Sequence, residues 1–234
     1  MTNLILLTES NAKRWAAARL TRNFTTVARR LVAPAAKARY QAVSARTGVP
    51  WPAIAVIHER ECSQDWTGSL AQGDPWNRVS VHVPAGRGPF RSWEEAAMDA
   101  LVNCAPYAAR NTDWSAGGTL TLLERYNGLG YAARGRPSPY VWSGTDQYSC
   151  GKYVRDGVYD PNVVDRQLGC AGMLKAMMAL DPTITFTGAP ITPAASVKPI
   201  PAEKPATPSI TNPSQGSIGA FIANIFNVVF RRKA

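Results

Sequence analysis

The stretch that most constrains the fold is GVPWPAIAVIHERECSQDW, residues 48–66, where an apolar run leads directly into titratable residues. Residues 51–57 are all apolar, and the letters HERE follow at residues 58–61. Such a run predicts a buried helix over Trp51–Cys62, with Pro52 tolerated in its first turn. We therefore expect this helix to pack in the core and to end in water or at a cleft.

Two glutamates follow the apolar run, and helical geometry separates them. Two residues on a helix point about 200° apart, so Glu59 and Glu61 cannot share one role. Glu61 continues the apolar stripe of Ile54 and Ile57, whereas Glu59 should face solvent. Burial raises the pKa of a carboxyl group, which suits a general acid at neutral pH. Glu61 is the candidate catalytic acid, and the alternative is a helix-end carboxylate without a chemical role.

The formal net charge of +10 is unevenly distributed along the chain. Before Gly48 there are nine Lys or Arg residues and one acidic residue, Glu9, whereas residues 48–188 are nearly neutral. Basic segments bind polyanions such as nucleic acid, anionic lipid or a cell-wall polymer. We predict a basic helical N-terminal extension at residues 1–37 before a globular domain at residues 38–182. The alternative is a solvated helical face that packs on this domain.

Beyond the buried helix, the pattern predicts further helices and a little β structure. The alternation in RVSVHVP predicts a short strand and a small β lobe around residues 76–84. Helices are predicted over SWEEAAMDALVNC, where Ser92 is the N-cap and Glu95 completes a capping box, over AGGTLTLLERYNGLGY and over VVDRQLGCAGMLKAMMAL. The fold class is therefore mainly α, within the α+β class.

The C-terminal part changes composition twice. Residues 183–215 are rich in Pro and Thr and predict a solvated linker. Residues 216–234 predict an amphipathic helix whose apolar face would lie in an anionic membrane interface, unless it folds back or mediates oligomers. No stretch reaches the roughly 20 apolar residues that span a bilayer, and we recognise no secretory signal.

Aromatic and amide side chains gather between residues 126 and 148. Aromatic faces stack on sugar rings, and amide or hydroxyl groups bond sugar hydroxyls, so this cluster is typical of a glycan-binding face. An aromatic wall of the core is the alternative. The candidate substrate-binding residues from this region are Tyr126, Asn127, Tyr131, Tyr140 and Trp142.

Several segments carry a family resemblance and occur in the family's order: ARYQAVSARTGVPWPAIAVIHERECSQDW, LAQGDPW, VPAGRGPFRSWEEAAMDAL, ERYNGLGY and SPYVWSGTDQY. They resemble the lysozyme-like superfamily of goose-type lysozymes and lytic transglycosylases, and more closely a set of phage and bacterial peptidoglycan hydrolases. The resemblance covers roughly residues 38–180. It implies a lysozyme-like helical domain in which Glu61 is the catalytic acid and Tyr126 and Asn127 line the saccharide groove.

The resemblance also implies a reaction. Glu61 would protonate the glycosidic oxygen between N-acetylmuramic acid and N-acetylglucosamine. A hydrolase requires a second carboxylate, for which Asp74 and Asp65 are candidates and Glu124 a weaker one. A lytic transglycosylase needs one acid, because the substrate's own 6-hydroxyl attacks. Two residues depart from the family pattern: Cys62 stands where Ser is usual, and Gln72 where Asn is usual.

Other chemistries find less support. A catalytic zinc needs about three protein ligands, and the chain has two histidines, His58 and His82. We therefore predict no metal site and no cofactor, and place His58 and Gln72 beside the cleft as substrate-binding residues. Serine- and cysteine-nucleophile patterns and phosphate loops are not supported. The four cysteines have no CxxC spacing and are expected to be mostly reduced.

Taken together, the sequence predicts an endolysin-type peptidoglycan hydrolase of the muramidase class, with a lytic transglycosylase as the alternative. A non-catalytic cell-wall or membrane-binding protein is the rival from another class. The expected partners are peptidoglycan glycan strands and an anionic membrane, with no specific nucleic acid, and a monomer is expected. We expect synthesis in the bacterial host cytoplasm and action on the cell wall after holin-type release.

Overall fold

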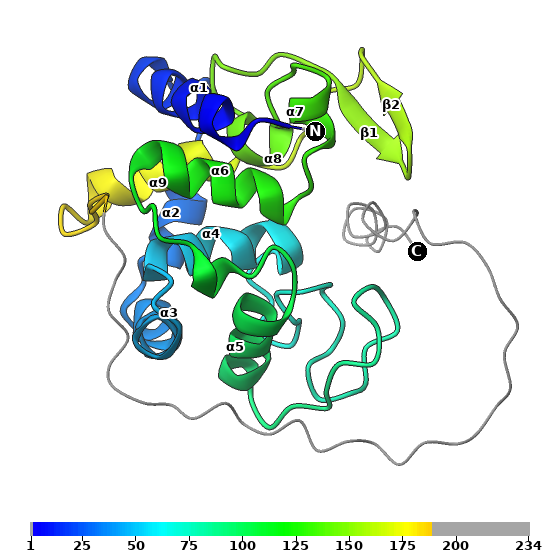
Figure 1. The fold of residues 1–234 in the computed structure, drawn as a ribbon. Coiled ribbons are helices and arrows are strands. Elements are labelled where there is room, and N and C mark those ends of the chain that lie inside the picture. Colours follow the sequence, from blue (N-terminus) through cyan, green and yellow to red (C-terminus); the bar gives the residue numbers. More distant parts are fainter. Residues whose placement is uncertain (1, 189–234) are drawn as a thin grey trace, which may run out of the picture.

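The computed structural model describes residues 2–188. Within them the protein is mainly helical and has one two-stranded antiparallel sheet, so the α+β class is confirmed (Figure 1). The predicted amphipathic helix at residues 216–234 lies outside the described residues, as does the predicted linker from residue 189 onward.

The elements follow one another in a simple order. The helices are α1 (Leu4–Ala17), α2 (Thr25–Leu31), α3 (Pro34–Thr47), α4 (Trp51–Cys62), α5 (Trp93–Asn103), the short 3-10 helix η1 (Ala108–Arg110), α6 (Ala116–Tyr126), α7 (Gly130–Ala133), α8 (Pro139–Trp142) and α9 (Cys170–Leu180). The strands are β1 (Lys152–Arg155) and β2 (Val158–Asp160), which form a hairpin before α9.

The central element is α4, and it has the predicted bounds. Residues 52–58 of this helix are all buried, and it packs against α3, α6 and α9 (Figure 1). Burying one Ile or Val side chain contributes roughly 1.5–3 kcal/mol, so the apolar run holds this helix inside the molecule. The helix ends in a left-handed turn, because Ser63 and Gln64 both have positive φ angles, 54° and 59°.

The basic N-terminal segment shares the core of the following domain. The boundary expected between residues 37 and 38 falls inside α3, and Phe24 and Leu31 belong to the same hydrophobic cluster as α4. Helix α1 lies along α6 (Figure 1), where the buried Asn11 donates a 3.1 Å hydrogen bond to Thr121 Oγ1. The apolar sides of these helices therefore pack inward, while most of their basic residues remain at the surface.

The prediction of a strand around residues 76–84 is wrong, because the sheet is formed by residues 152–160. The backbone N–H groups of Val81 and His82 donate to Asp74 Oδ2, each at 2.9 Å, so they are not available to a neighbouring strand. Val81 is 75% exposed, which means that the alternating valines have no buried face to cover. The side-chain acceptor and the missing apolar partner together explain the irregular loop.

The helix ends show both agreement and difference. Ser92 Oγ caps α5 by accepting from the Glu95 N–H at 3.2 Å, as predicted, but Glu95 Oε2 accepts from the Arg91 N–H rather than from Ser92.

The first residues of the expected linker are packed, because Ile184 is buried and the Phe186 ring meets Trp15 edge-on at 5.0 Å. No helix within residues 2–188 is both long and apolar enough to cross a membrane.

Candidate active site

Glu61 lies in the last turn of α4, and its side chain is where helical phase predicts it. The residue is 8% exposed, whereas Glu59, two positions earlier, turns to the surface and pairs with Arg30 at 3.0 Å. The two glutamates thus occupy different environments. Glu61 is the acid that the apolar face carries to the end of the helix.

A tyrosine from α8 holds one oxygen of this carboxyl group. Tyr140 is 3% exposed, and its hydroxyl donates a 2.8 Å hydrogen bond to Glu61 Oε1. The second oxygen, Oε2, has no hydrogen-bond partner among residues 2–188 and is not fully enclosed. One oxygen is therefore fixed by a hydrogen bond, and the other can carry the proton of the neutral acid.

The environment of Glu61 favours its neutral form. Burial raises the pKa of Glu61 to about 7, against the lowering effects of the Tyr140 hydrogen bond and the Arg60 charge. Near neutral pH the group is thus shared between acid and carboxylate. A carboxyl group in this state can donate a proton and later take one back.

A network of ion pairs formed by Arg60, Asp165 and Lys152 lies next to Tyr140 and Glu61. The guanidinium of Arg60 lies over the Tyr140 ring at 4.5 Å, and its Nη2 pairs with Asp165 Oδ2 at 3.2 Å. Lys152 Nζ pairs with the other oxygen of Asp165 at 2.9 Å. Burial alone would raise the pKa of Asp165, but the charges of Arg60 and Lys152 hold it below its usual value. This network fixes the ring whose hydroxyl binds Glu61.

The two predicted partner carboxylates are engaged in the loop after α4. Asp74 is 3% exposed; its Oδ1 lies 2.6 Å from His82 Nδ1, and its Oδ2 accepts the two backbone hydrogen bonds of that loop. Burial would raise the pKa of Asp74, but these bonds hold it below its usual value. Asp65 is exposed and closes a turn, because its Oδ1 accepts from the N–H and hydroxyl of Thr67.

Two predicted substrate-binding residues have their polar atoms bonded inside the protein. Gln72 Oε1 accepts from Ser69 Oγ at 3.0 Å, and Gln72 Nε2 donates to the Pro84 carbonyl at 3.3 Å. His58 is fully buried, with Nε2 at 3.0 Å from the Asp65 carbonyl and Nδ1 at 3.0 Å from Tyr40 Oη.

The hydrogen bonds of His58 fix its form. A carbonyl can only accept, so Nε2 carries the hydrogen and Nδ1 accepts from the hydroxyl of Tyr40. Burial lowers the pKa of His58 to about 4, and the ring is therefore neutral at physiological pH. It packs among Tyr40, Trp66 and Trp93, which ties the start of the loop to α3 and α5.

The predicted aromatic residues form a buried wall. Tyr126 donates to the Leu70 carbonyl at 3.1 Å, and Tyr131 accepts from the Tyr153 N–H at 3.0 Å. Trp142 is fully buried, while Asn127 caps the end of α6 and is partly exposed. Within residues 2–188 the rings of Tyr126, Tyr131, Tyr140 and Trp142 are all buried, and the Tyr140 hydroxyl reaches Glu61.

Cys62 ties the end of α4 to the loop. Its thiol donates to the Ser69 carbonyl at 3.1 Å, so it makes a hydrogen bond of the kind that a serine hydroxyl makes. Burial raises the pKa of Cys62, which keeps the thiol protonated. All four cysteines are free, and within residues 2–188 no group of three His, Cys, Asp or Glu side chains is arranged to hold a metal ion.

The residues that support Glu61 were not predicted from the sequence. Arg60 lies on the same face of the helix as Ile57 and Glu61, so the helical pattern could have predicted that it is buried. Asp165 and Lys152 gave no signal, because Asp165 meets Arg60 from a distant part of the chain and Lys152 pairs with Asp165. Glu124, the weaker acid candidate, lies elsewhere: it faces Asn11 across the contact between α1 and α6.

Comparisons of the chain with protein-family models, with curated proteins and with solved structures find no match. The chemistry of the site thus rests on the sequence and on the geometry around Glu61.

Proposed function

We propose that this protein is an endolysin-type enzyme that cleaves the MurNAc–GlcNAc glycosidic bond of peptidoglycan, with Glu61 as the general acid. The observation that carries the proposal is the state of this carboxyl group. It is buried, has a pKa of about 7, is held at Oε1 by Tyr140, and its second oxygen has no hydrogen-bond partner among residues 2–188. The motif resemblance over residues 38–180 supplies the substrate and the lysozyme-like fold.

The chemistry follows from the two oxygens of Glu61. With Oε1 accepting from the Tyr140 hydroxyl, the proton of the neutral acid is carried by Oε2 and is presented to the glycosidic oxygen. When the bond breaks, the carboxylate that forms is stabilised by the Tyr140 hydrogen bond and the nearby Arg60 charge. General acid catalysis of this kind typically contributes about 10²–10⁴-fold in rate.

The muramidase and the lytic transglycosylase differ in the step that follows protonation of the glycosidic oxygen. A hydrolase requires a second carboxylate as base or nucleophile. Both oxygens of Asp74 already accept hydrogen bonds, and Asp65 Oδ1 closes a turn with Thr67. This occupancy favours the single-acid course of a lytic transglycosylase, in which the muramic 6-hydroxyl attacks, over the muramidase course.

The other class of function is a cell-wall or membrane-binding protein that has kept the fold without catalysis. Perturbed carboxyl pKa values cluster at functional sites, and Glu61 combines one with a hydrogen bond from Tyr140 to a single oxygen, so its state favours an enzyme. We further propose that the enzyme is made in the host cytoplasm, reaches the wall through a holin-type route and acts as a monomer. The basic surface and the C-terminal segment would then contact anionic membrane.

The test is digestion of purified peptidoglycan followed by mass spectrometry of the products. Anhydro-muramic ends indicate a transglycosylase, reducing muramic ends indicate a muramidase, and cut peptides would contradict both. The matched variant is Glu61→Gln, which keeps the shape of the side chain and removes the proton. It should lose digestion while still binding to sedimented wall, whereas an unchanged product yield would leave only the binding-protein alternative.

A further inference from the structure

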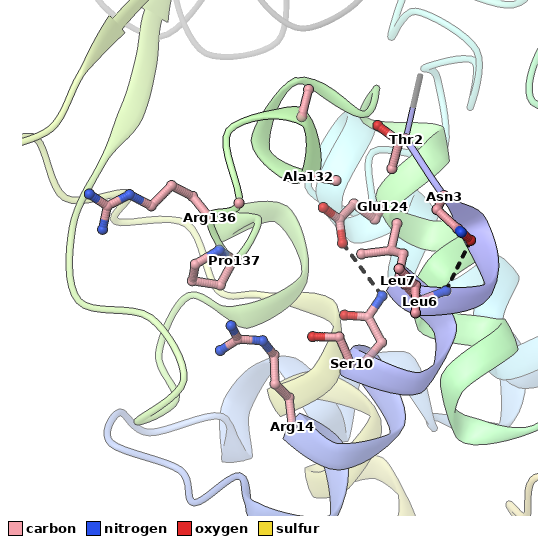
Figure 2. A pocket seen from close by; sticks show the side chains of 13 residues that line it. Thr2, Asn3, Leu6, Leu7, Ser10, Arg14, Glu124, Ala132, Arg136 and Pro137 are labelled. Carbon is pink, nitrogen blue, oxygen red and sulfur yellow. Dashed lines mark hydrogen bonds between the residues drawn. The ribbon is translucent and has the colours of Figure 1, made fainter.

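A pocket of about 540 Å³ lies away from Glu61, between the N-terminal helix and the segment that follows α7. Its walls come from three parts of the chain: the start of α1, the end of α6 and residues 132–137 (Figure 2). Glu61 does not line it. Volumes of this size are typical of sites for small organic ligands.

Glu124 lies on the inner side of this pocket and lacks a full set of partners. The residue is 1% exposed, and its Oε1 has no hydrogen-bond partner among residues 2–188. Among the described residues, the only hydrogen bond to its Oε2 comes from Asn11 Nδ2, at a long 3.5 Å, and Asn11 makes a shorter bond to Thr121. A buried carboxyl oxygen without a donor is costly to the folded protein, so this oxygen calls for a ligand that donates.

The remaining polar groups of the pocket are basic or neutral. Figure 2 shows Arg14 and Ser10, both on α1, directed toward the segment at Pro137, with Glu124 beside them. Arg136 lies at the rim, and its guanidinium points away from Glu124 (Figure 2). Leu6, Leu7 and Ala132 supply apolar surface between these groups. The pocket therefore offers a guanidinium for an anion, a carboxyl group for a donor, and an apolar floor.

This combination selects the chemistry of the ligand. A carboxylate suits Arg14, because guanidinium groups bind carboxylates with paired hydrogen bonds. An N–H group or an ammonium suits Glu124. Inorganic phosphate and phosphate headgroups match the guanidinium but bring no donor to the buried carboxyl group. A molecule that carries both groups together with small apolar side chains is the end of a short peptide.

We propose that this pocket binds the free carboxyl end of a short peptide, with its carboxylate on Arg14 and an N–H group on Glu124. The choice of peptide rests on the proposed function, since peptidoglycan carries stem peptides that end in alanine and a free carboxylate. The pocket would hold a stem peptide of the wall that Glu61 cleaves, and so select wall that is not yet cross-linked.

The test is calorimetric titration of the full-length protein with the synthetic stem peptide Ala–isoGln–Lys–D-Ala, in which the C-terminus is the only carboxylate. One-to-one, saturable binding is expected. Arg14→Met and Glu124→Gln should each weaken it about tenfold or more, as expected for a hydrogen bond to a charged group. Lys13→Met is the matched control, because it removes the same charge from the same helix outside the pocket. It should bind as the wild type does.

A second ligand identifies the group that Arg14 holds. The same peptide with a C-terminal amide should bind about tenfold more weakly to the wild type and equally weakly to Arg14→Met, because the two changes remove one interaction. Arg136 lies on an exposed loop, so Arg136→Met carries no risk to folding. It should weaken binding of the peptide with a free carboxylate by a smaller factor. Absence of peptide binding to the wild type, or equal binding of the amide, would overturn the proposal.

Glu61→Gln separates this proposal from the proposed function. It should bind the stem peptide with wild-type affinity, since Glu61 lies outside the pocket. If wall digestion occurs and the peptide does not bind, the peptide site fails and the enzyme stands. If the peptide binds and no wall is digested by the wild type, the reverse holds.

Discussion

Glu61 and Glu124 are two buried glutamates with the same ionisation behaviour and different surroundings. Burial raises the pKa of each to about 7. Glu61 accepts a 2.8 Å hydrogen bond from Tyr140, and a buried ion network fixes that tyrosine. Glu124 has one long contact and one oxygen without a donor among the described residues.

The difference teaches that a raised pKa marks a carboxyl group as unusual without saying what it does. At Glu61 one oxygen is held and the other is open, which is the arrangement a proton donor needs. Glu124, whose Oε1 has no donor among the described residues, lines a pocket that also contains Arg14, which fits the proposed binding site. Their partners, rather than their ionisation, separate the two roles.

The largest expected effect tests this separation directly. Glu61→Gln should reduce the rate of wall digestion by about 10²–10⁴-fold, because it removes the transferable proton. Glu124→Gln changes the same atoms at the other site and should keep the catalytic step. Single-turnover digestion of a defined glycan strand without stem peptides measures this. Equal losses in both variants would contradict the assignment of different roles.

The ion network next to Glu61 gives the next effect; within the described residues Glu124 has no such network beside it. Asp165→Asn leaves Arg60 buried with an uncompensated charge and should lower the free energy of unfolding by about 3–5 kcal/mol. Urea denaturation followed by tryptophan fluorescence measures it. Asp156→Asn is the control: this aspartate is exposed in the turn between β1 and β2, so the same substitution should cost little. A cost for Asp165→Asn no larger than that of the control would show that the network is not needed.

The shared ionisation predicts a shared pH dependence of stability. The folded-state pKa of each glutamate, about 7, lies above the usual value of 4.5, so the folded protein binds more protons than the unfolded chain between these pH values. The free energy of unfolding should therefore fall as pH rises through this range, by up to about 3 kcal/mol for each glutamate.

Substitution divides this pH dependence between the two sites. Glu61→Gln and Glu124→Gln should each reduce the fall between pH 5 and pH 8 by a similar amount, about 2–3 kcal/mol, measured by urea denaturation at both values. His58, with its pKa lowered to about 4, contributes the opposite slope below pH 6.5, but it is present in every variant and cancels. A variant that keeps the full slope would show that its glutamate titrates normally.

The smallest effect sharpens the role of the Tyr140 bond. This bond stabilises the carboxylate and lowers the pKa of Glu61, so Tyr140→Phe should raise that pKa further. Because the acid must be protonated to act, the alkaline limb of the pH–rate profile should move to higher pH by about 1 unit. Tyr126→Phe removes a hydroxyl that bonds the Leu70 carbonyl instead, and should not move this limb.

Much of the fold was predictable because its signals are local. The apolar run of α4 and the Ser92 cap of α5 depend on neighbours within one or two turns, and both helices have the predicted starts. The strand expected around residues 76–84 failed for a non-local reason, since Asp74 takes the N–H groups that a strand partner would need. Charge alone could not show whether residues 1–37 form an extension apart from the globular domain, because the apolar sides of α1 and α2 decide how these helices pack.

The sequence by itself determined which glutamate of the HERE segment is buried, since helical phase is a property of consecutive residues. Only the tertiary structure decided what each acid meets. Tyr140 is 79 positions from Glu61, Asp165 is 105 positions from Arg60, and Asn11 is 113 positions from Glu124. The ionisation and partners of a buried group depend on such distant contacts, and these exist only after the helices have packed.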